Sequence, residues 1–164
     1  MFKRGSLYSR NDVWEKYYPN QGKRPRGGPW DTGYVREEKE LLVFVNICTP
    51  GRTEHNYENE FDEKSRILTW FGKNNAHSEQ PLFQKVITGK LTPHFFARWD
   101  DRSGFLYLGI GGIIDFEDRA KLETGETTIR LIVQIKRIKR KIQKGTGLQK
   151  KIAKVLSGRK TLAA

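Results

Sequence analysis

The residues from Gly72 to Ser78 combine a cation, two amides, an imidazole and a hydroxyl within seven positions. Side chains of these kinds hydrogen-bond to the base edges and phosphate oxygens of nucleic acids. Glycine and asparagine are also common in solvated surface turns. The segment therefore has two interpretations, a nucleic-acid-binding loop and an ordinary surface turn.

A second candidate segment, Asn20–Tyr34, is rich in glycine and proline, which disfavour regular structure. Long loops in compact domains are often functional or disordered. Three cationic side chains in this segment could bind phosphates or guanine edges: Lys23, Arg24 and Arg26. Trp30 and Tyr34 are apolar anchors that would order the segment. An arm that reaches a nucleic-acid groove and a flexible solvated loop both fit this composition.

Both segments adjoin predicted β-strands. Ile67–Phe71 carries β-branched and aromatic side chains directly before Gly72, and the apolar run Leu41–Cys48 predicts a central strand. Further strands are predicted over residues 94–99, 105–111, 113–116 and 127–135, with a hairpin turn at 100–104. About six strands with turn signals between them favour an antiparallel open barrel or pseudobarrel.

Short helices complete the predicted fold. One helix begins after Ser9, where Ser9 and Asp12 form a capping pattern, and it ends at Pro19. Another is predicted over Pro81–Gly89. The acidic run before Ile67 predicts a solvated turn. The fold class is therefore mainly β (α+β), with one or two short helices.

Positive charge is concentrated near the C-terminus. The net charge is +12, yet the segment Lys136–Lys160 alone contains eleven Lys and Arg and no acid, so the remainder is nearly neutral. Apolar residues repeat at helical spacing within this basic run. We therefore predict a domain over residues 1–135 and a basic amphipathic helical tail over residues 136–164. Its three main interpretations are a nucleic-acid-binding arm, a helix that docks in a larger assembly and a solubilising tail. Membrane-surface binding is a fourth, which the lack of aromatic residues on the apolar face disfavours.

Several classes of site are excluded by composition. Cys48 is the single cysteine, which rules out an intrachain disulfide and a multi-cysteine zinc site. No apolar run approaches the roughly 20 residues that cross a bilayer, and the first residues lead into no apolar signal core. We expect a cytoplasmic protein with no membrane partner.

Five spaced stretches lie between residues 6 and 111: LYSRNDV, LLVFVNI, GRTEHNYENEF, LTWFGKNNAHSEQP and HFFARWDDRSGFLYLGIG. Together they resemble the DNA-recognition domain attached to restriction endonucleases and helicase-nuclease fusions. Such domains are similar to the pseudobarrel shared by plant B-three transcription factors and some restriction enzymes, in which two loop arms grip the DNA major groove. The tail after Ile135 has no counterpart in this resemblance.

By position, the resemblance puts one arm within Lys23–Arg36 and the other within Gly72–Ser78. It implies a sequence- or modification-specific double-stranded DNA-binding domain that targets a restriction or defence nuclease, fused or separate. Expected phosphate contacts come from the tail and from Arg10, Lys23, Arg24 and Arg52. Expected base contacts come from Arg26, Asp31, Arg36, Lys73, Asn74, Asn75 and His77.

Two tryptophans, Trp30 and Trp70, are included among the DNA-binding residues in a supporting role. We expect them to position the arms rather than to touch bases. If the domain instead flips a modified base out of the duplex, the same aromatic side chains would line its pocket.

A small nuclease is the main alternative. Asp115, Gln134 and Lys136 fit a loose version of the Mg²⁺ site of restriction-type nucleases, although both segments also fit ordinary strands. A His-Asn-His metal site from His55, Asn74 and His77 lacks the usual spacing. No other metal, cofactor or catalytic residue is expected.

RNA binding through the basic tail is a further alternative. Gly109, Gly111 and Gly112 do not form a phosphate-binding loop, because no Gly-Lys-Ser/Thr follows them. Glycines within a strand more often mark a bulge or a close backbone approach.

Overall fold

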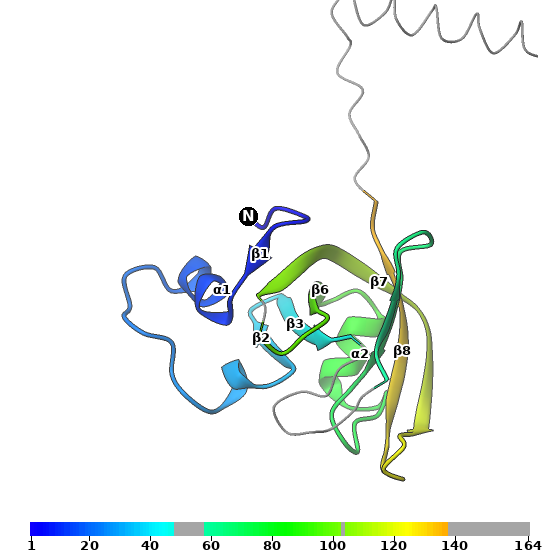
Figure 1. Cartoon of the computed structure of the whole chain (residues 1–164). Helices are drawn as coiled ribbons and strands as arrows, with labels where there is room; N and C mark the ends of the chain where they lie inside the picture. The colour runs from blue at the N-terminus through cyan, green and yellow to red at the C-terminus, as the bar shows by residue number, and fades with distance from the viewer. Residues whose placement is uncertain (48–57, 103, 138–164) are drawn as a thin grey trace, which may run out of the picture.

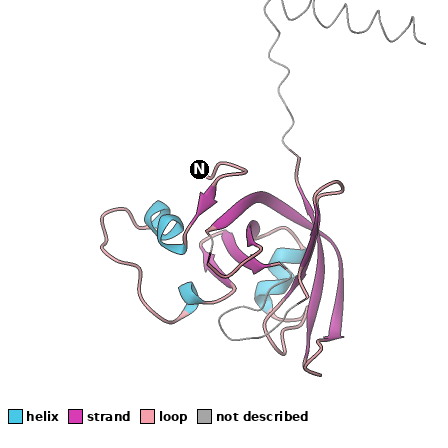
Figure 2. Ribbon diagram, in the orientation of Figure 1, coloured by secondary structure: helices cyan, strands magenta, loops and turns pink. Residues whose placement is uncertain are grey.

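The computed structural model describes residues 1–47, 58–102 and 104–137. Eight strands and two α-helices lie in this part of the chain (Figures 1 and 2). The strands are β1 (Leu7–Tyr8), β2 (Tyr34–Glu37), β3 (Glu40–Asn46), β4 (Glu60–Asp62), β5 (Ile67–Phe71), β6 (Thr92–Arg98), β7 (Phe105–Lys121) and β8 (Thr127–Ile135). The helices are α1 (Arg10–Tyr17) and α2 (Pro81–Ile87), with a short 3-10 helix, η1, at Pro29–Asp31.

The strands form one curved sheet in the order β2-β3-β6-β7-β8-β5-β4, and β1 pairs with β7. The pair β3–β6 is parallel, whereas the other pairs are antiparallel. Strands β2 and β4 end the path, so the sheet curls without closing. This confirms the predicted fold class, an open mainly β barrel with two short helices.

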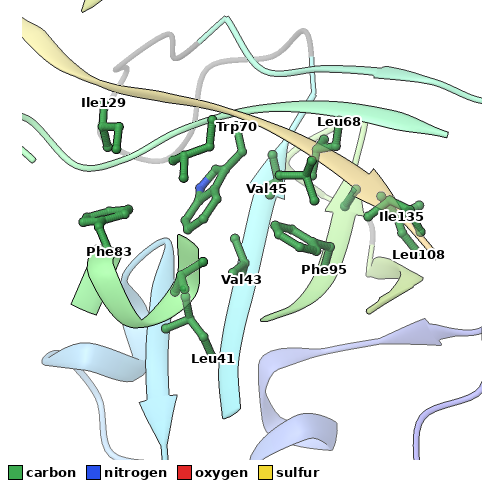
Figure 3. Close-up of a cluster of buried hydrophobic side chains, with 14 of the residues drawn as sticks. Leu41, Val43, Val45, Leu68, Trp70, Phe83, Phe95, Leu108, Ile129 and Ile135 are labelled. Atoms are coloured by element: carbon green, nitrogen blue, oxygen red, sulfur yellow. The ribbon is translucent and has the colours of Figure 1, made fainter. Parts of the chain in front are cut away.

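The parallel pair β3–β6 is buried on both faces because each strand alternates between two hydrophobic clusters. One cluster fills the inside of the barrel and includes Leu41, Val43, Val45, Trp70, Phe83 and Phe95 (Figure 3). The other lies on the outer face and includes Val13, Trp30, Leu42, Phe44, Phe96 and Tyr107. A nearly continuous apolar run is what a strand buried on both faces requires.

The N-terminal residues form the layer that covers the outer face of β3 and β6. The Ser9 hydroxyl accepts from the Asp12 amide at 3.0 Å, and the Asp12 carboxylate accepts from the Ser9 amide at 2.7 Å, so the predicted capping box starts α1. Val13 is fully buried from this helix. Phe2 packs edge-on against Phe96, with ring centroids 5.1 Å apart. This layer connects the first candidate loop to the barrel.

Strand β7 is much longer than predicted, because the two strands expected at 105–111 and 113–116 are one continuous strand. Its first half pairs with β6 and its second half with β8, and the register shifts between Ile113 and Asp115. Figure 1 shows β7 bending as it passes from one half of the sheet to the other. A Cβ atom on Gly111 would lie 2.4 Å from Val133 and 2.7 Å from Phe95. Glycine is therefore needed here for close backbone approach, as expected.

Other differences from the predicted elements concern short strands. Strands β1, β2 and β4 were not predicted, and the acidic run before Ile67 contributes β4 as well as a turn. These strands are two to four residues long, too short to show an alternating apolar pattern, and pairing with β7, β3 and β5 fixes them. Cys48, Arg52, His55 and residues 138–164 lie outside the described residues. The division into a domain and a basic tail therefore stays a prediction.

Candidate nucleic-acid interface

The first candidate loop, residues 19–33, joins α1 to β2 and is held by an internal ion pair. Arg24 Nη1 lies 2.6 Å from Asp31 Oδ1, and Arg24 Nε donates to Asn11 Oδ1 at 2.9 Å. Asp31 also accepts from the Gly27 amide. The hydrogen bond from Arg24, and then that from Gly27, lower the pKa of Asp31 below its usual range. Arg24 and Asp31 thus shape the loop.

Arg10 fixes the end of the first loop from α1. Its guanidinium lies over the Phe44 ring at 4.4 Å and donates to the Thr32 carbonyl at 2.7 Å. A cation over an aromatic face, with a backbone carbonyl as acceptor, is a stable half-buried arrangement. Arg10, expected to contact phosphate, therefore supports the fold as well.

The outer part of the first loop borders a cleft of about 850 Å³ between the loop and α1. Trp14 and Tyr18 stack with ring centroids 4.1 Å apart and form its aromatic wall. Lys23 and Arg26, both exposed, line the same cleft. Cations beside stacked aromatic rings are a combination that suits phosphates and planar bases.

The second candidate loop, residues 72–78, is fixed against β7 and β8. The Asn75 amide donates to the Thr127 carbonyl at 2.9 Å, and the Ser78 amide donates to the Asp118 carboxylate at 2.8 Å. The Asn74 side-chain amide donates to Glu126. The loop is consequently rigid, and Asn74 and Ser78 serve its own structure. Lys73, Asn75 and His77 are the exposed members of the loop.

One contact joins the second loop to the end of the first. The Lys73 ammonium lies 4.3 Å from the centre of the Tyr34 ring, at the start of β2. Lys73 is an exposed residue, yet partial burial of its ammonium group lowers its pKa. Tyr34 in turn packs edge-on against Trp70, with ring centroids 5.6 Å apart. Tyr34 therefore couples the positions of the two loops.

Trp30 and Trp70 lie in the hydrophobic clusters, with 7% and 3% of their surface exposed. They stand directly behind the first and second loops, which is compatible with the positioning role expected of them. Neither lines the cleft beside α1, so a base pocket walled by these two tryptophans is absent there.

Residues 2–145 match the family model described as Domain of unknown function (DUF3427). The chain belongs to the DUF3427 family. No curated protein matches the DUF3427 chain.

Two solved structures of other proteins match this DUF3427 chain. One is the SRA domain of SUVH5, solved in a complex with hemi-methylated CG DNA. The match covers 82% of this chain and 89% of the SUVH5 chain, with a TM-score of 0.52 and 8% sequence identity. The other is named "DNA modification-dependent restriction endonuclease AspBHI". That match covers 64% of this chain and 61% of the AspBHI chain, with a TM-score of 0.47 and 14% sequence identity. The SUVH5 likeness shows that this chain has a fold similar to that of the SUVH5 SRA domain.

Other predicted site residues of the DUF3427 chain are dispersed. Arg36 is exposed on β2 and donates to the Glu38 carbonyl at 3.1 Å. The β7–β8 ladder pairs Asp115 with Ile132, and Gln134 with Gly112. The Gln134 amide nitrogen donates to the Ser65 carbonyl at 2.9 Å.

No three His, Cys, Asp or Glu side chains within residues 1–47, 58–102 and 104–137 are grouped so as to hold a metal ion. In the same segments, no helix has the length and apolarity needed to cross a bilayer.

Sequence reasoning missed the residues that hold the two loops. Tyr34 was noted only as an apolar anchor, and Asp118, Glu126 and Thr127 were not considered. Each of these three contacts a loop residue at least 40 positions away in the sequence. No local pattern signals such a contact.

The Arg24–Asp31 pair predicts an acid-sensitive first loop. A carboxylate whose pKa is lowered by folding contributes stability above its unfolded pKa of about 4, and that contribution is lost as the pH falls through the lowered folded value. We expect the loop to open below about pH 4, with faster exchange of the Gly27 amide hydrogen. Asp31→Asn should give fast exchange already at neutral pH. Asp101→Asn, on the exposed turn after β6, is the control and should leave Gly27 unchanged.

Proposed function

We propose that this DUF3427 domain binds double-stranded DNA and recognises a base sequence or a base modification. The observation that carries the proposal is the fold shared with the SUVH5 SRA domain, whose solved structure is a complex with hemi-methylated CG DNA. A shared fold does not by itself imply a shared function. The residues of the two loops supply the additional support.

The two loops have the chemistry of a reading surface. Among the predicted contact residues of the two loops, the exposed ones are Lys23, Arg26, Lys73, Asn75 and His77. Arginine pairs with guanine edges, asparagine with adenine edges, and lysine with phosphates or guanine. Arg24, Asp31 and Asn74 support this surface from behind through their internal hydrogen bonds. The rigid attachment of the second loop lowers the entropy cost of binding.

The finer parts of the proposal are the biological setting and the way in which the two loops contact the DNA groove. The sequence resemblance supports a targeting module of a restriction or defence nuclease, with B-three-like arms in the major groove. The nuclease would be a fused domain or a separate subunit. We propose a cytoplasmic location, which the single cysteine, Cys48, favours. Arg52 and the basic tail would add phosphate contacts to those of Lys23.

Selection from random duplex libraries tests the proposal. Two libraries, one unmodified and one with 5-methylcytosine, would be presented to the full chain at about 150 mM salt, where weak phosphate-only binding is largely suppressed. Enrichment of a short consensus, or preference for the methylated library, is the expected result. Equal recovery of all duplexes would overturn it, and stronger binding to RNA would favour the RNA alternative.

Removal of the exposed side chains of the second loop should reduce discrimination between target and non-target DNA. Each lost base contact is expected to cost about 1–3 kcal/mol at the target and little elsewhere. We choose Asn75→Gly, because Asn75 has φ of +62° and glycine tolerates that backbone, together with His77→Ala. Binding to target and scrambled duplexes would be measured for each.

The matched control is Gln84→Ala, which removes an exposed amide from α2 and leaves the loop intact. This control should bind both duplexes as the unaltered chain does. Equal weakening on target and scrambled DNA by the loop variants would show that the loop contacts phosphates alone.

A further inference from the structure

Three arginine side chains from distant parts of the sequence gather at one end of the barrel. Arg66, in the turn between β4 and β5, donates from Nη2 to the Leu108 carbonyl at 2.9 Å. Arg4 lies against the neighbouring Gly109, since a Cβ atom built there would be 2.6 Å from Arg4 Nε. Arg137, just after β8, donates to the Lys64 carbonyl at 3.2 Å. The N-terminus, the β4–β5 turn and the end of β8 thus meet here.

The positive charge of this arginine cluster is not balanced within the described residues. The ion pairs among the described residues join Arg24 to Asp31, His94 to Glu40 and Arg130 to Glu117. None involves Arg4, Arg66 or Arg137. Burial lowers the pKa of Arg66, and the charges of Arg4 and Arg137 lower it further. Like charges brought together without a carboxylate repel one another, which an anion would relieve.

A donor in the cluster also lacks an acceptor. Arg66 Nε is buried and has no hydrogen-bond partner within the described residues. A buried donor without a partner is costly. Arg66 is held with φ of +57°, a conformation that arginine rarely adopts. The fold therefore holds the Arg66 backbone in a strained conformation and its guanidinium in an electrostatically unfavourable place.

We propose that Arg4, Arg66 and Arg137 bind a phosphodiester group of the DNA backbone. The proposal rests on the proposed DNA-binding function and adds a contact site that lies outside the two loops. Guanidinium groups match phosphate oxygens with paired N–H donors. The exposed Lys64 and Lys136 flank the cluster, and nine further Lys and Arg follow Arg137 in the sequence.

The position of the cluster is compatible with a duplex that also contacts the second loop. Arg66 precedes β5 and Gly72 follows it, so the five residues of this strand separate the two sites. A strand of that length spans about 17 Å. That distance is about five base pairs along a duplex, or half a helical turn. One duplex aligned with β5 reaches both sites.

The test compares Arg4→Gln/Arg137→Gln with the control Arg130→Gln in the full chain. Arg130 is exposed and paired with Glu117 at 2.8 Å, so the control removes an arginine whose charge is already balanced. Binding to an unmodified duplex would be measured from about 50 to 200 mM salt. The double variant should bind about ten-fold more weakly, with a salt slope shallower by about 1–2 units. Arg130→Gln should change both the affinity and the salt slope much less.

An equal loss in the control, or an unchanged slope in the double variant, would overturn the proposal. Thermal melting of each variant verifies folding. A second readout avoids substitution: the Arg66 Nε–H NMR signal should shift on addition of the duplex to the unaltered chain. A shift with inorganic phosphate but none with duplex would assign the site to a small phosphate anion and refute the DNA-backbone contact.

The outcomes separate this site from the proposed function. Failure of the proposed function would appear as equal recovery of all duplexes in the selection, while the arginine variants still altered the salt slope. Failure of the arginine site would appear as an unchanged slope, while the selection still gave a consensus. Because phosphate carries no sequence information, the ratio of target to scrambled binding should be the same with and without Arg4 and Arg137.

Discussion

Replacement of Gly111 by alanine is expected to lower the free energy of unfolding by about 3 kcal/mol, because the added methyl group overpacks the core. Its Cβ would lie 2.4 Å from Val133 Cγ1 and 2.7 Å from Phe95 Cε2, two fully buried side chains on β8 and β6. The melting temperature should fall by roughly 6–12 °C. Urea unfolding and thermal melting followed by circular dichroism would measure both.

Gly112→Ala is the matched control, since a Cβ at the next residue of the same strand meets nothing within 4 Å. That variant should be as stable as the unaltered chain, or slightly more stable, because alanine reduces the entropy of the unfolded chain. Equal destabilisation by the two substitutions would show that the bend of β7 needs glycine for backbone flexibility at both positions, rather than for space at Gly111.

Removal of positive charge from residues 138–164 is expected to cause the largest loss of DNA affinity. The segment contains nine Lys and Arg. With about six of these charges on phosphates, their replacement by glutamine should make the plot of log K against log salt shallower by about five units. Because phosphate contacts do not report sequence, the preferred duplex should be the same.

A chain with all nine residues changed to glutamine keeps its length, so loss of charge is separated from loss of chain. The comparison would be made with the target duplex and a scrambled duplex across a salt series. Disappearance of the preference for the target would contradict a purely electrostatic tail. Loss of nearly all affinity in this variant, together with no preference for any duplex sequence in the unaltered chain, would favour the alternative in which the tail binds RNA.

Much of the fold follows from local pattern. The apolar run that became β3 and the β-branched run that became β5 were correctly predicted, because strands with a buried face carry their own signal. The capping pair Ser9 and Asp12 located α1. Strand β4 was missed because its three residues, Glu-Phe-Asp, are held by pairing with β5 rather than by their own propensity.

The candidate site was harder to predict than the fold. Sequence chemistry selected the two loops, but it did not separate exposed side chains from those that serve the loops themselves. Lys73 contacts Tyr34, and Ser78 contacts Asp118, across separations of 39 and 40 residues. The arginine cluster combines residues near positions 4, 66 and 137, a grouping that only the sheet topology creates.

The sheet order has a consequence for synthesis of the chain. Strand β5 and the loop that follows it pair with β8, whose residues leave the ribosome about 60 positions later. Domains dominated by such distant pairings fold slowly. Until Thr127 and the rest of β8 emerge, the 72–78 loop has no acceptor for its Asn75 amide. We therefore expect a nascent chain that ends before residue 127 to expose the apolar face of β5 and to need a chaperone, and the 72–78 loop to take its final position only after β8 has been synthesised.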